Sequence, residues 1–283
     1  MKKIAFLFLV IENPNFPTIW NKYFRGNSSK YNIYIHPKYP DLLKWKKKYI
    51  IKNLKETQWG FIVEAYIELL KEAYKDPDNY KFVTISESCI PIQSFNNFYE
   101  ATINDSRSWI KSMKISNYDL KERIDKQPNK NKPLHFIKNY ARFCLNRDHV
   151  KELLSKEKEL KFFYNMHVGD EFFLSVLYPL KNVRDFAVTY DDWDYVNKLK
   201  TNIKDKKKKL YELQEKEGVN KRQELSNLQN MYDSISKNPK TIINVEEDLD
   251  KINNCNSYFY RKFDKNSNIE NYWEIIIDNH ENT

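Results

Sequence analysis

The sequence predicts an α/β protein with a mixed, mostly parallel sheet that is flanked by helices. Residues 4–11 form a continuous apolar run, which is typical of a strand covered on both faces. Strand and helix patterns then alternate as far as residue 95, as they do in parallel sheets. The third strand pattern ends abruptly in Ser86, Glu87 and Ser88, where open α/β sheets present ligand groups. From this stretch alone, an edge strand followed by a turn is an equally good interpretation.

Each element predicted in the first half of the chain follows from a local sequence pattern. Residues 17–24 predict a short amphipathic helix with proline in its first turn. Residues 31–37 predict a second strand that carries His36 near its end, so that strand, helix and strand form a βαβ unit. Apolar side chains recur at helical spacing between residues 61 and 74, which predicts an amphipathic helix leading into the strand at residues 82–85.

The second half has weaker patterns. We expect a short strand at residues 108–110, an exposed loop at 121–133 and a strand at 140–146. A helix follows that strand, with Asn146 or Asp148 as its cap. Residues 188–193 predict a further short strand, which ends in carboxylates and an aromatic side chain.

Asp170 and Glu171 form an acidic pair in the first turn of a predicted apolar helix. The helix dipole favours carboxylates at that position, so the pair is explained without any function. The alternative is that one of the two is a general base, and the local sequence does not decide between these interpretations.

Much of the net charge of +9 lies in one segment. Residues 198–209 contain seven lysines and one aspartate. Apolar residues recur at helical spacings through residues 198–236, which predicts a charged helical hairpin inserted into a single domain formed by residues 1–197 and 237–283. A basic chain would suit a polyanionic partner, but we interpret these lysines as a solvated face and expect no nucleic acid.

Cysteine usage and the first apolar run indicate the compartment. Cys89, Cys144 and Cys255 are widely spaced and fit no metal-ligand pattern, so we interpret them as free thiols in a reducing compartment. The run at residues 4–11 is too short to span a bilayer and has no cleavage site behind it. We therefore expect a soluble, cytoplasmic protein without a transmembrane segment or a secretion signal of its own.

Several common sites are missing from the sequence. With four glycines in the chain there is no glycine-rich phosphate loop, the five histidines have no zinc spacing, and there is no GxSxG motif. Polar strand ends, the acidic pair and the late cations Lys240, Arg261 and Lys262 remain. A carboxylate that deprotonates an acceptor hydroxyl, with cations that neutralise a departing diphosphate, is the equipment of a nucleotide-sugar glycosyltransferase.

Eight motifs follow one another in the order of a known family. They are KIAFLFL, YNIYIH, TQWG, DPDNYKFVTISESCIPI, NYARFCLNRDHV, GDEFF, VTYDDW and YFYRKF. On these motifs the chain resembles the core-2/I-branching β-1,6-N-acetylglucosaminyltransferases, especially their plant-type and microbial or viral branch. The resemblance implies a GT-A-type α/β fold, a UDP-sugar donor such as UDP-GlcNAc, a glycan or glycoprotein acceptor, inversion at the anomeric carbon, and no required metal or other cofactor.

The resemblance also assigns roles by position. Glu171 matches the catalytic base, with Asp170 beside it as an orienting or hydrogen-bonding group. Lys262 matches a lysine that binds the diphosphate. Lys240 falls, with altered spacing, where the family has an arginine, and a lysine would grip phosphate with a single point charge. The remaining expected donor contacts are Val10, Glu12, His36, Ser86, Glu87 and Arg261, and the expected acceptor contacts are Ser88, Tyr190, Asp192 and Trp193.

The chain also departs from the family. Metal-dependent enzymes of this fold carry an Asp-X-Asp motif after the central strand, where this chain has Ser86, Glu87 and Ser88. Asp192-Trp193-Asp194 does follow a strand, which leaves a metal site open. Animal members are Golgi membrane proteins with disulfides, whereas this sequence implies a soluble enzyme of a host cytoplasm or viral factory. A catalytically inactive transferase fold that binds glycan or nucleic acid is the alternative function.

Overall fold

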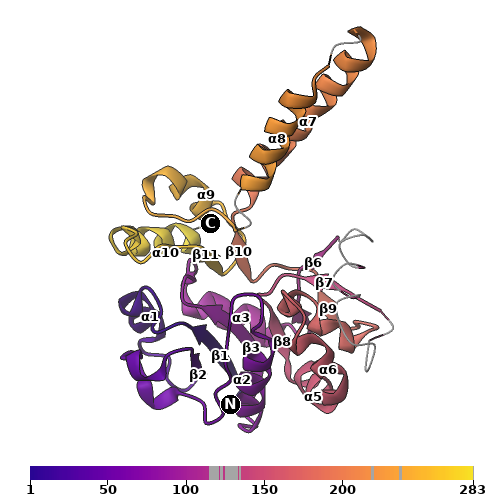
Figure 1. The fold of residues 1–283 in the computed structure, drawn as a ribbon. Helices are drawn as coiled ribbons and strands as arrows, with labels where there is room; N and C mark the ends of the chain where they lie inside the picture. The colour runs from indigo at the N-terminus through magenta and orange to yellow at the C-terminus, as the bar shows by residue number, and fades with distance from the viewer. Residues whose placement is uncertain are drawn as a thin grey trace. The chain divides into compact units, whose positions relative to one another are not determined.

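The computed structural model describes residues 1–114, 121, 124, 133, 135–217, 220–235 and 238–282 (Figure 1). The chain divides into two compact units. The first consists of Met1–Tyr190 and Ile243–Thr283, and the second is Asp191–Ile242. The hairpin expected at 198–236 thus belongs to a unit that extends beyond it at both ends. The loop expected at 121–133 lies almost wholly outside the described residues.

The first unit is built on a six-stranded sheet with the strand order β2-β1-β3-β8-β5-β9. β1 pairs in parallel with both β2 and β3, and β8 joins β3 in the antiparallel sense. The predicted α/β class, with a mixed sheet whose longest strands are parallel, is confirmed. The bounds of these strands are β1 Lys3–Val10, β2 Tyr31–Pro37, β3 Asn79–Ser86, β5 Ser108–Trp109, β8 Cys144–Asn146 and β9 Val183–Arg184.

Smaller sheets complete the pairing. β10, β11 and β4 form one, and β6 pairs with β7 in another. The strand predicted at 140–146 is shorter than expected, because the chain passes there from β7 to β8 and the Tyr140 N–H donates to the Lys111 carbonyl (2.9 Å). The bounds are β4 Ile90–Pro91, β6 Ser112–Met113, β7 Lys138–Asn139, β10 Thr189–Asp191 and β11 Phe259–Arg261.

β1 is buried on both faces, as its uninterrupted apolar sequence predicts. On one face it shares a core with α2 (Val63–Tyr74), through the side chains of Ala5, Leu7 and Leu9. On the other face Phe6 and Phe8 contact α1 (Pro17–Phe24), and the rings of Phe8 and Trp20 have centroids 4.9 Å apart. α1 and β2 match the predicted residues, and α2 begins two positions after the predicted start.

The prediction of an apolar helix that begins at the acidic pair is wrong. Residues 169–177 form two 3₁₀ turns instead, η3 (Gly169–Glu171) and η4 (Phe173–Leu177). Phe172 separates them with φ −131° and ψ −22°, outside the helical region. All of η4 is buried, so packing on every side, and not a one-sided apolar stripe, determines the local conformation.

The helix after β8 begins as predicted. The side chain of Asn146 accepts a hydrogen bond from the His149 N–H (2.8 Å), which identifies Asn146 and not Asp148 as the cap of α5. The other helical segments described in the first unit are α3 Phe95–Asn104, α5 Arg147–Ser155, α6 Glu157–Tyr164, α9 Leu249–Asn253, α10 Trp273–Glu281, and the 3₁₀ turns η1 Pro40–Leu42, η2 Lys47–Tyr49, η5 Glu246–Asp248 and η6 Ile269–Asn271.

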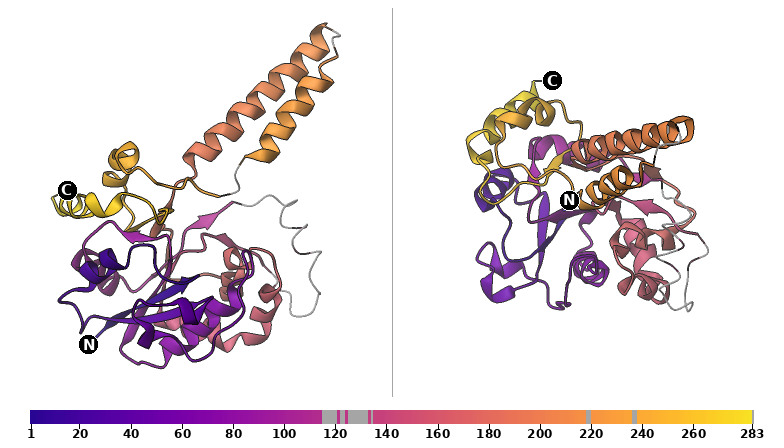
Figure 2. Two further views of the ribbon diagram at one scale, coloured as in Figure 1. Left: turned by 60° about the vertical axis from the view of Figure 1, so that its left-hand side comes forward. Right: turned by 45° about the horizontal axis from the view of Figure 1, so that its top comes forward.

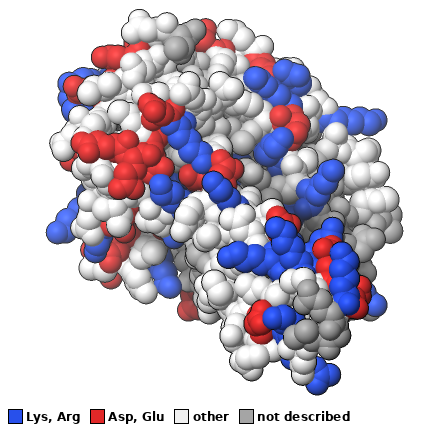
Figure 3. All heavy atoms as spheres, turned by 90° about the horizontal axis from the view of Figure 1, so that it is seen from above, with Lys and Arg blue, Asp and Glu red and all other residues white. Residues whose placement is uncertain are grey.

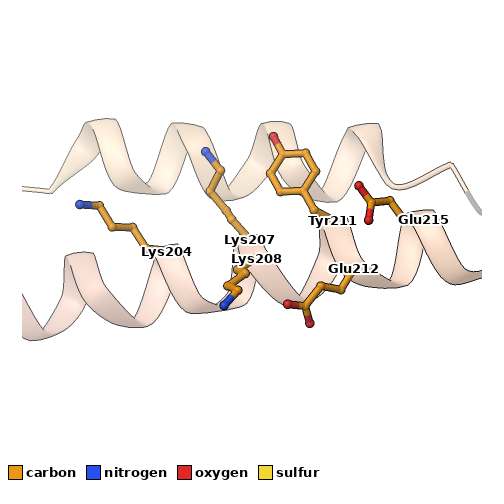
Figure 4. Close-up of a pocket in the computed structure, with 6 residues that line it drawn as sticks. All are labelled: Lys204, Lys207, Lys208, Tyr211, Glu212 and Glu215. Atoms are coloured by element: carbon orange, nitrogen blue, oxygen red, sulfur yellow. The ribbon is translucent and has the colours of Figure 1, made fainter. Parts of the chain in front are cut away.

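The second unit contains the predicted pair of helices, α7 (Asp194–Glu217) and α8 (Arg222–Ser234), drawn from two sides in Figure 2. Lys207 Nζ donates to Gln229 Oε1 across the pair (2.6 Å). A shallow groove is lined from α7, by Lys204, Lys207, Lys208, Tyr211, Glu212 and Glu215 (Figure 4). No predicted site residue lines this groove. Among the described residues, no helix combines the length and apolarity needed to cross a bilayer.

Asn146→Ala should lower the free energy of unfolding by about 2 kcal/mol, because one side chain makes two buried hydrogen bonds. Besides capping α5, Asn146 Nδ2 donates to the Ser106 carbonyl (2.9 Å). Urea denaturation followed by circular dichroism measures the change. Asn104→Ala, at an exposed amide in the last turn of α3, is the control and should cost less than about 0.5 kcal/mol. Equal midpoints for the two variants would contradict the capping role.

Candidate active site

The carboxyl ends of β1, β2 and β3 lie at one edge of the main sheet, because the three strands are parallel (Figure 1). In this register Leu9 pairs with His36 on one side and with Ser86 on the other. This edge of the sheet therefore carries several residues that the sequence analysis predicts to contact the UDP-sugar donor. Those at or directly after the strand ends are Val10, Glu12, His36, Ser86 and Glu87.

The loop after β1 ties this edge to the segment that follows β11. The backbone N–H of Asn15 donates to the Glu87 carbonyl, and Asn15 Nδ2 donates to the Phe263 carbonyl, both at 2.8 Å. The Phe263 N–H in turn donates to the Ser88 carbonyl (3.1 Å). Lys262, which the sequence assigns to the diphosphate, is thereby held beside the loop after β3 and is half-buried. The sequence did not single out Asn15.

The loop after β3 presents small hydroxyls in a buried cluster. Ser86 Oγ lies 3.4 Å from Ser88 Oγ and 3.1 Å from Cys89 Sγ. Both serines and the cysteine are buried, whereas Glu87 is partly exposed. The two serines thus shape the wall of the edge, and Glu87 is the member of this loop whose carboxylate reaches solvent.

Asp170 is a buried carboxyl group at the start of the 3₁₀ turn η3. It is 6% exposed, and its Oδ1 makes no hydrogen bond with any described residue. Burial, and next the neighbouring charge of Glu171, raise the pKa of Asp170 from its ordinary value of 3.8 to about 6. The guanidinium groups of Arg142 and Arg261 act in the opposite direction and favour the ionised form.

A buried tyrosine and two arginines surround this carboxyl group. Arg142 Nη1 donates to the hydroxyl of Tyr66 (3.0 Å). Burial, the largest cause, raises the pKa of Tyr66 to about 12, with Asp170 acting in the same direction and both arginines in the opposite one. The cluster joins α2, the chain before β8, η3 and β11. The sequence analysis did not single out Tyr66 or Arg142 as candidate site residues.

Glu171 is the accessible carboxylate of the acidic pair. Its side chain is 25% exposed, and its Oε2 lies 3.1 Å from Lys138 Nζ. Lys138 is the first residue of β7, and the sequence did not single it out. A carboxylate that is partly exposed, oriented by an ammonium group and adjacent to a buried acid can accept a proton from a bound hydroxyl.

Two predicted ligand contacts of the first unit have partners within the protein. His36 is 0% exposed, its Nε2 accepts from the Lys55 N–H (2.9 Å), and burial lowers its pKa. The Tyr190 ring lies 5.0 Å from that of Tyr260, with Lys251 Nζ 5.5 Å from the Tyr190 ring. His36 thus anchors the loop after β2, while Tyr190 remains half-buried and accessible from one side.

Three predicted contacts belong to the second unit. They are Asp192, Trp193 and Lys240. Asp192 Oδ1 accepts from the Asp194 N–H (3.1 Å) at the first turn of α7, and the Asp192 carbonyl accepts from the Lys240 N–H (2.8 Å). These hydrogen bonds therefore close the base of the hairpin.

In the described ranges, no group of carboxylates forms a set of metal ligands. Within those ranges, no three His, Cys, Asp or Glu side chains lie close enough together to hold an ion. In the Asp192-Trp193-Asp194 string, Asp192 Oδ1 accepts a hydrogen bond from the Asp194 N–H, and Asp194 is the first residue of α7.

The chain belongs to the Core-2/I-Branching enzyme family, whose family model matches residues 4–222. Glycosyltransferase BC10 of Oryza sativa subsp. japonica is 26% identical over 180 residues, which cover 57% of this chain and 42% of the rice protein. The chain thus spans less than half the length of that relative.

The solved structures that match this chain have low sequence identity to it. The galactosyltransferase LgtC, determined in complex with donor and acceptor sugar analogues, gives a TM-score of 0.33 at 10% identity, over 67% of this chain and 74% of that one. A197 from STIV gives 0.28 at 9% identity, over 53% of this chain and 68% of that one. The fold assignment therefore rests on the sheet and helices described above, and the family assignment on the sequence match.

Asp170→Asn should change how stability depends on pH. The folded pKa is about 6 against 3.8 in the unfolded chain, so the folded protein holds a proton that the unfolded chain has lost between these values. The stabilising contribution of this group is present below pH 4 and is lost as the pH rises through 6. Relative to the wild type, the variant should gain about 3 kcal/mol over that interval.

Urea denaturation at a series of pH values measures this gain. Asp105→Asn is a control of opposite sign, because hydrogen bonds from Arg107 hold the pKa of Asp105 well below its ordinary value. Its stability deficit against the wild type should shrink as the pH falls. Parallel pH curves for Asp170→Asn and the wild type would contradict the assigned environment of Asp170.

Proposed function

We propose that this protein is an inverting glycosyltransferase that moves a sugar from a UDP-sugar to a hydroxyl group of a glycan or glycoprotein. The observation that carries the proposal is the pair of unlike carboxyl groups in η3, one buried and one accessible, beside cations from β7, the chain before β8, and β11. Family membership supports a transferase, and the donor that the sequence resemblance favours is UDP-GlcNAc.

Glu171 is the general base of the proposed reaction. It accepts the proton of the acceptor hydroxyl while that oxygen attacks the anomeric carbon and the bond to UDP breaks. Lys138 keeps the carboxylate oriented, since its ammonium group lies 3.1 Å away. Asp170 stays largely protonated below pH 6 and limits the negative charge next to the base.

The leaving diphosphate is neutralised by cations. Arg261 is the last residue of β11, and Lys262 follows it beside the loop after β3. Lys240 is a third candidate for binding the diphosphate. Positive groups aimed at a departing phosphate stabilise the charge that develops in the transition state. Val10, Glu12, His36, Ser86 and Glu87 form the donor edge, His36 by anchoring its loop, and Ser88, Tyr190, Asp192 and Trp193 are the proposed acceptor contacts.

The proposed partners are a nucleotide sugar and a carbohydrate acceptor. On the face shown in Figure 3, lysine and arginine side chains lie in separate groups among acidic and uncharged ones. Nucleic-acid backbones favour a continuous positive stripe, whereas acidic side chains interrupt the positive groups on this face.

Glu171→Gln should lower the rate of transfer from UDP-GlcNAc by about 10²- to 10⁴-fold, because the amide cannot accept the proton. UDP binding, followed by isothermal titration calorimetry, should be unchanged. Glu152→Gln is the matched control, since Glu152 is an exposed carboxylate on α5 that pairs with Lys156. Full transfer by Glu171→Gln would exclude Glu171 as the base.

Transfer should persist in excess EDTA, because the proposed mechanism uses lysine and arginine where related chemistry uses a divalent cation. The measurement is the initial rate of UDP release with and without the chelator. Loss of the rate in EDTA, with recovery on added manganese, would instead assign a metal-binding role to Glu87 or Asp192.

A further inference from the structure

Trp59 differs from the other tryptophans in its exposure. All six tryptophans of the chain fall within the described ranges. Trp59 is 64% exposed, whereas the other five are buried or half-buried; these are Trp20, Trp45, Trp109, Trp193 and Trp273. An exposed indole ring that is held in one orientation offers a ligand a flat apolar face with an N–H donor at its edge.

A tight turn holds Trp59 in place. The Phe61 N–H donates to the Gln58 carbonyl (2.8 Å), and Gly60, with φ +82°, occupies the third position of this turn. The indole ring lies against the imidazole of His167, with centroids 5.2 Å apart. A Cβ at position 60 would come within 2.6 Å of His167 Cδ2, so only glycine leaves room for this contact.

The same turn is bonded to the segment that carries the acidic pair. The Val168 N–H donates to the Gly60 carbonyl (2.7 Å), and the Glu171 N–H donates to the Val168 carbonyl (3.1 Å). Two successive backbone hydrogen bonds therefore connect the tip of the turn to the backbone of the proposed base. Trp59 and Glu171 are held by one small, rigid piece of backbone.

We propose that Trp59 is the platform on which the acceptor sugar stacks. The inference rests on the proposed function, because it takes Glu171 as the group that meets the acceptor hydroxyl. The apolar C–H face of a pyranose ring packs well on an indole face, while its hydroxyl groups remain free for polar partners. A ring already ordered by His167 and by the turn loses little conformational entropy when the sugar binds.

The position of the turn favours the acceptor over the donor. An acceptor whose hydroxyl reaches Glu171 must lie against the segment that contains residues 167–171. Trp59 contacts this segment through the ring of His167, and its neighbour Gly60 accepts a hydrogen bond from Val168. The proposed donor contacts lie at the strand ends of β1, β2 and β3 and at residues 261–262. Trp59 thus provides an apolar surface for a neutral sugar, and the cations serve the diphosphate.

Steady-state kinetics of the full chain test the proposal. The donor is UDP-GlcNAc, and methyl β-galactoside, methyl β-glucoside and methyl α-mannoside are the acceptors. Trp59→Ala should raise the acceptor KM about tenfold, equivalent to about 1.4 kcal/mol, and leave the donor KM unchanged. Trp59→Phe should retain most of the affinity. Tyr211→Ala, at an exposed ring on α7, is the control and should change neither constant. An unchanged acceptor KM, or an effect on the donor KM alone, would overturn the proposal.

Tryptophan fluorescence gives a readout that needs no turnover. Titration of the UDP-bound wild type with the same glycosides should shift the emission of its exposed indole, and Trp59→Phe should lose this change. No change in the wild type up to the solubility limit of all three glycosides would overturn the platform. Failure of UDP-GlcNAc to bind or react would reject the proposed function instead, and thermal melting of each variant verifies that it is folded.

Discussion

The burial of β1 on both faces is the constraint on which the rest of the first unit depends. The ring of Phe6 meets seven other aromatic rings, contributed by α1, β2, α3 and β11. Its neighbours Ala5 and Leu7 face the core shared with α2. A strand enclosed in this way cannot slip by one residue without exchanging the side chains that face α1 with those that face α2. The carboxyl ends of β1, β2 and β3 are therefore fixed, and the loops after them start from rigid positions.

Around Asp170 the chain builds a polar site in a region that is otherwise apolar. Phe172 and Phe173 follow the acidic pair directly and are fully buried. Two adjacent carboxyl groups in such surroundings cannot both carry charge cheaply, and the structure separates them by environment. Asp170 lies inward, near the guanidinium groups, while Glu171 faces solvent and Lys138. This division of a single dipeptide into a buried acid and an accessible carboxylate follows mainly from the difference in burial.

The sequence predicted correctly those elements whose conformation depends on interactions within a single helix or strand. The helix at residues 17–24 and the strand at 31–37 were recognised to the residue, because proline placement and apolar periodicity act within one element. The turn at 169–177 was misread as an α-helix, since burial on all sides removes the amphipathic stripe. Arg142 was missed as a site residue because its partner Tyr66 is 76 positions away, and no local pattern reports such a contact. Glu171, by contrast, was predicted to be the base because GDEFF resembles a family motif, and that role stays a prediction.

The bond from Asn15 to Phe263 joins residues 248 positions apart. During synthesis β1, β2, β3, α1 and α2 are complete long before residue 263 leaves the ribosome, whereas β11, whose Phe259 packs on Phe6 and Trp20, is made only shortly before it. The donor edge is therefore closed late, by a segment that docks onto a sheet already formed. Until then the buried hydroxyls after β3 and the inner acid of η3 lack the strand that supplies Arg261. The order of synthesis therefore places the contacts made by Phe263 and Arg261 after the three parallel strands.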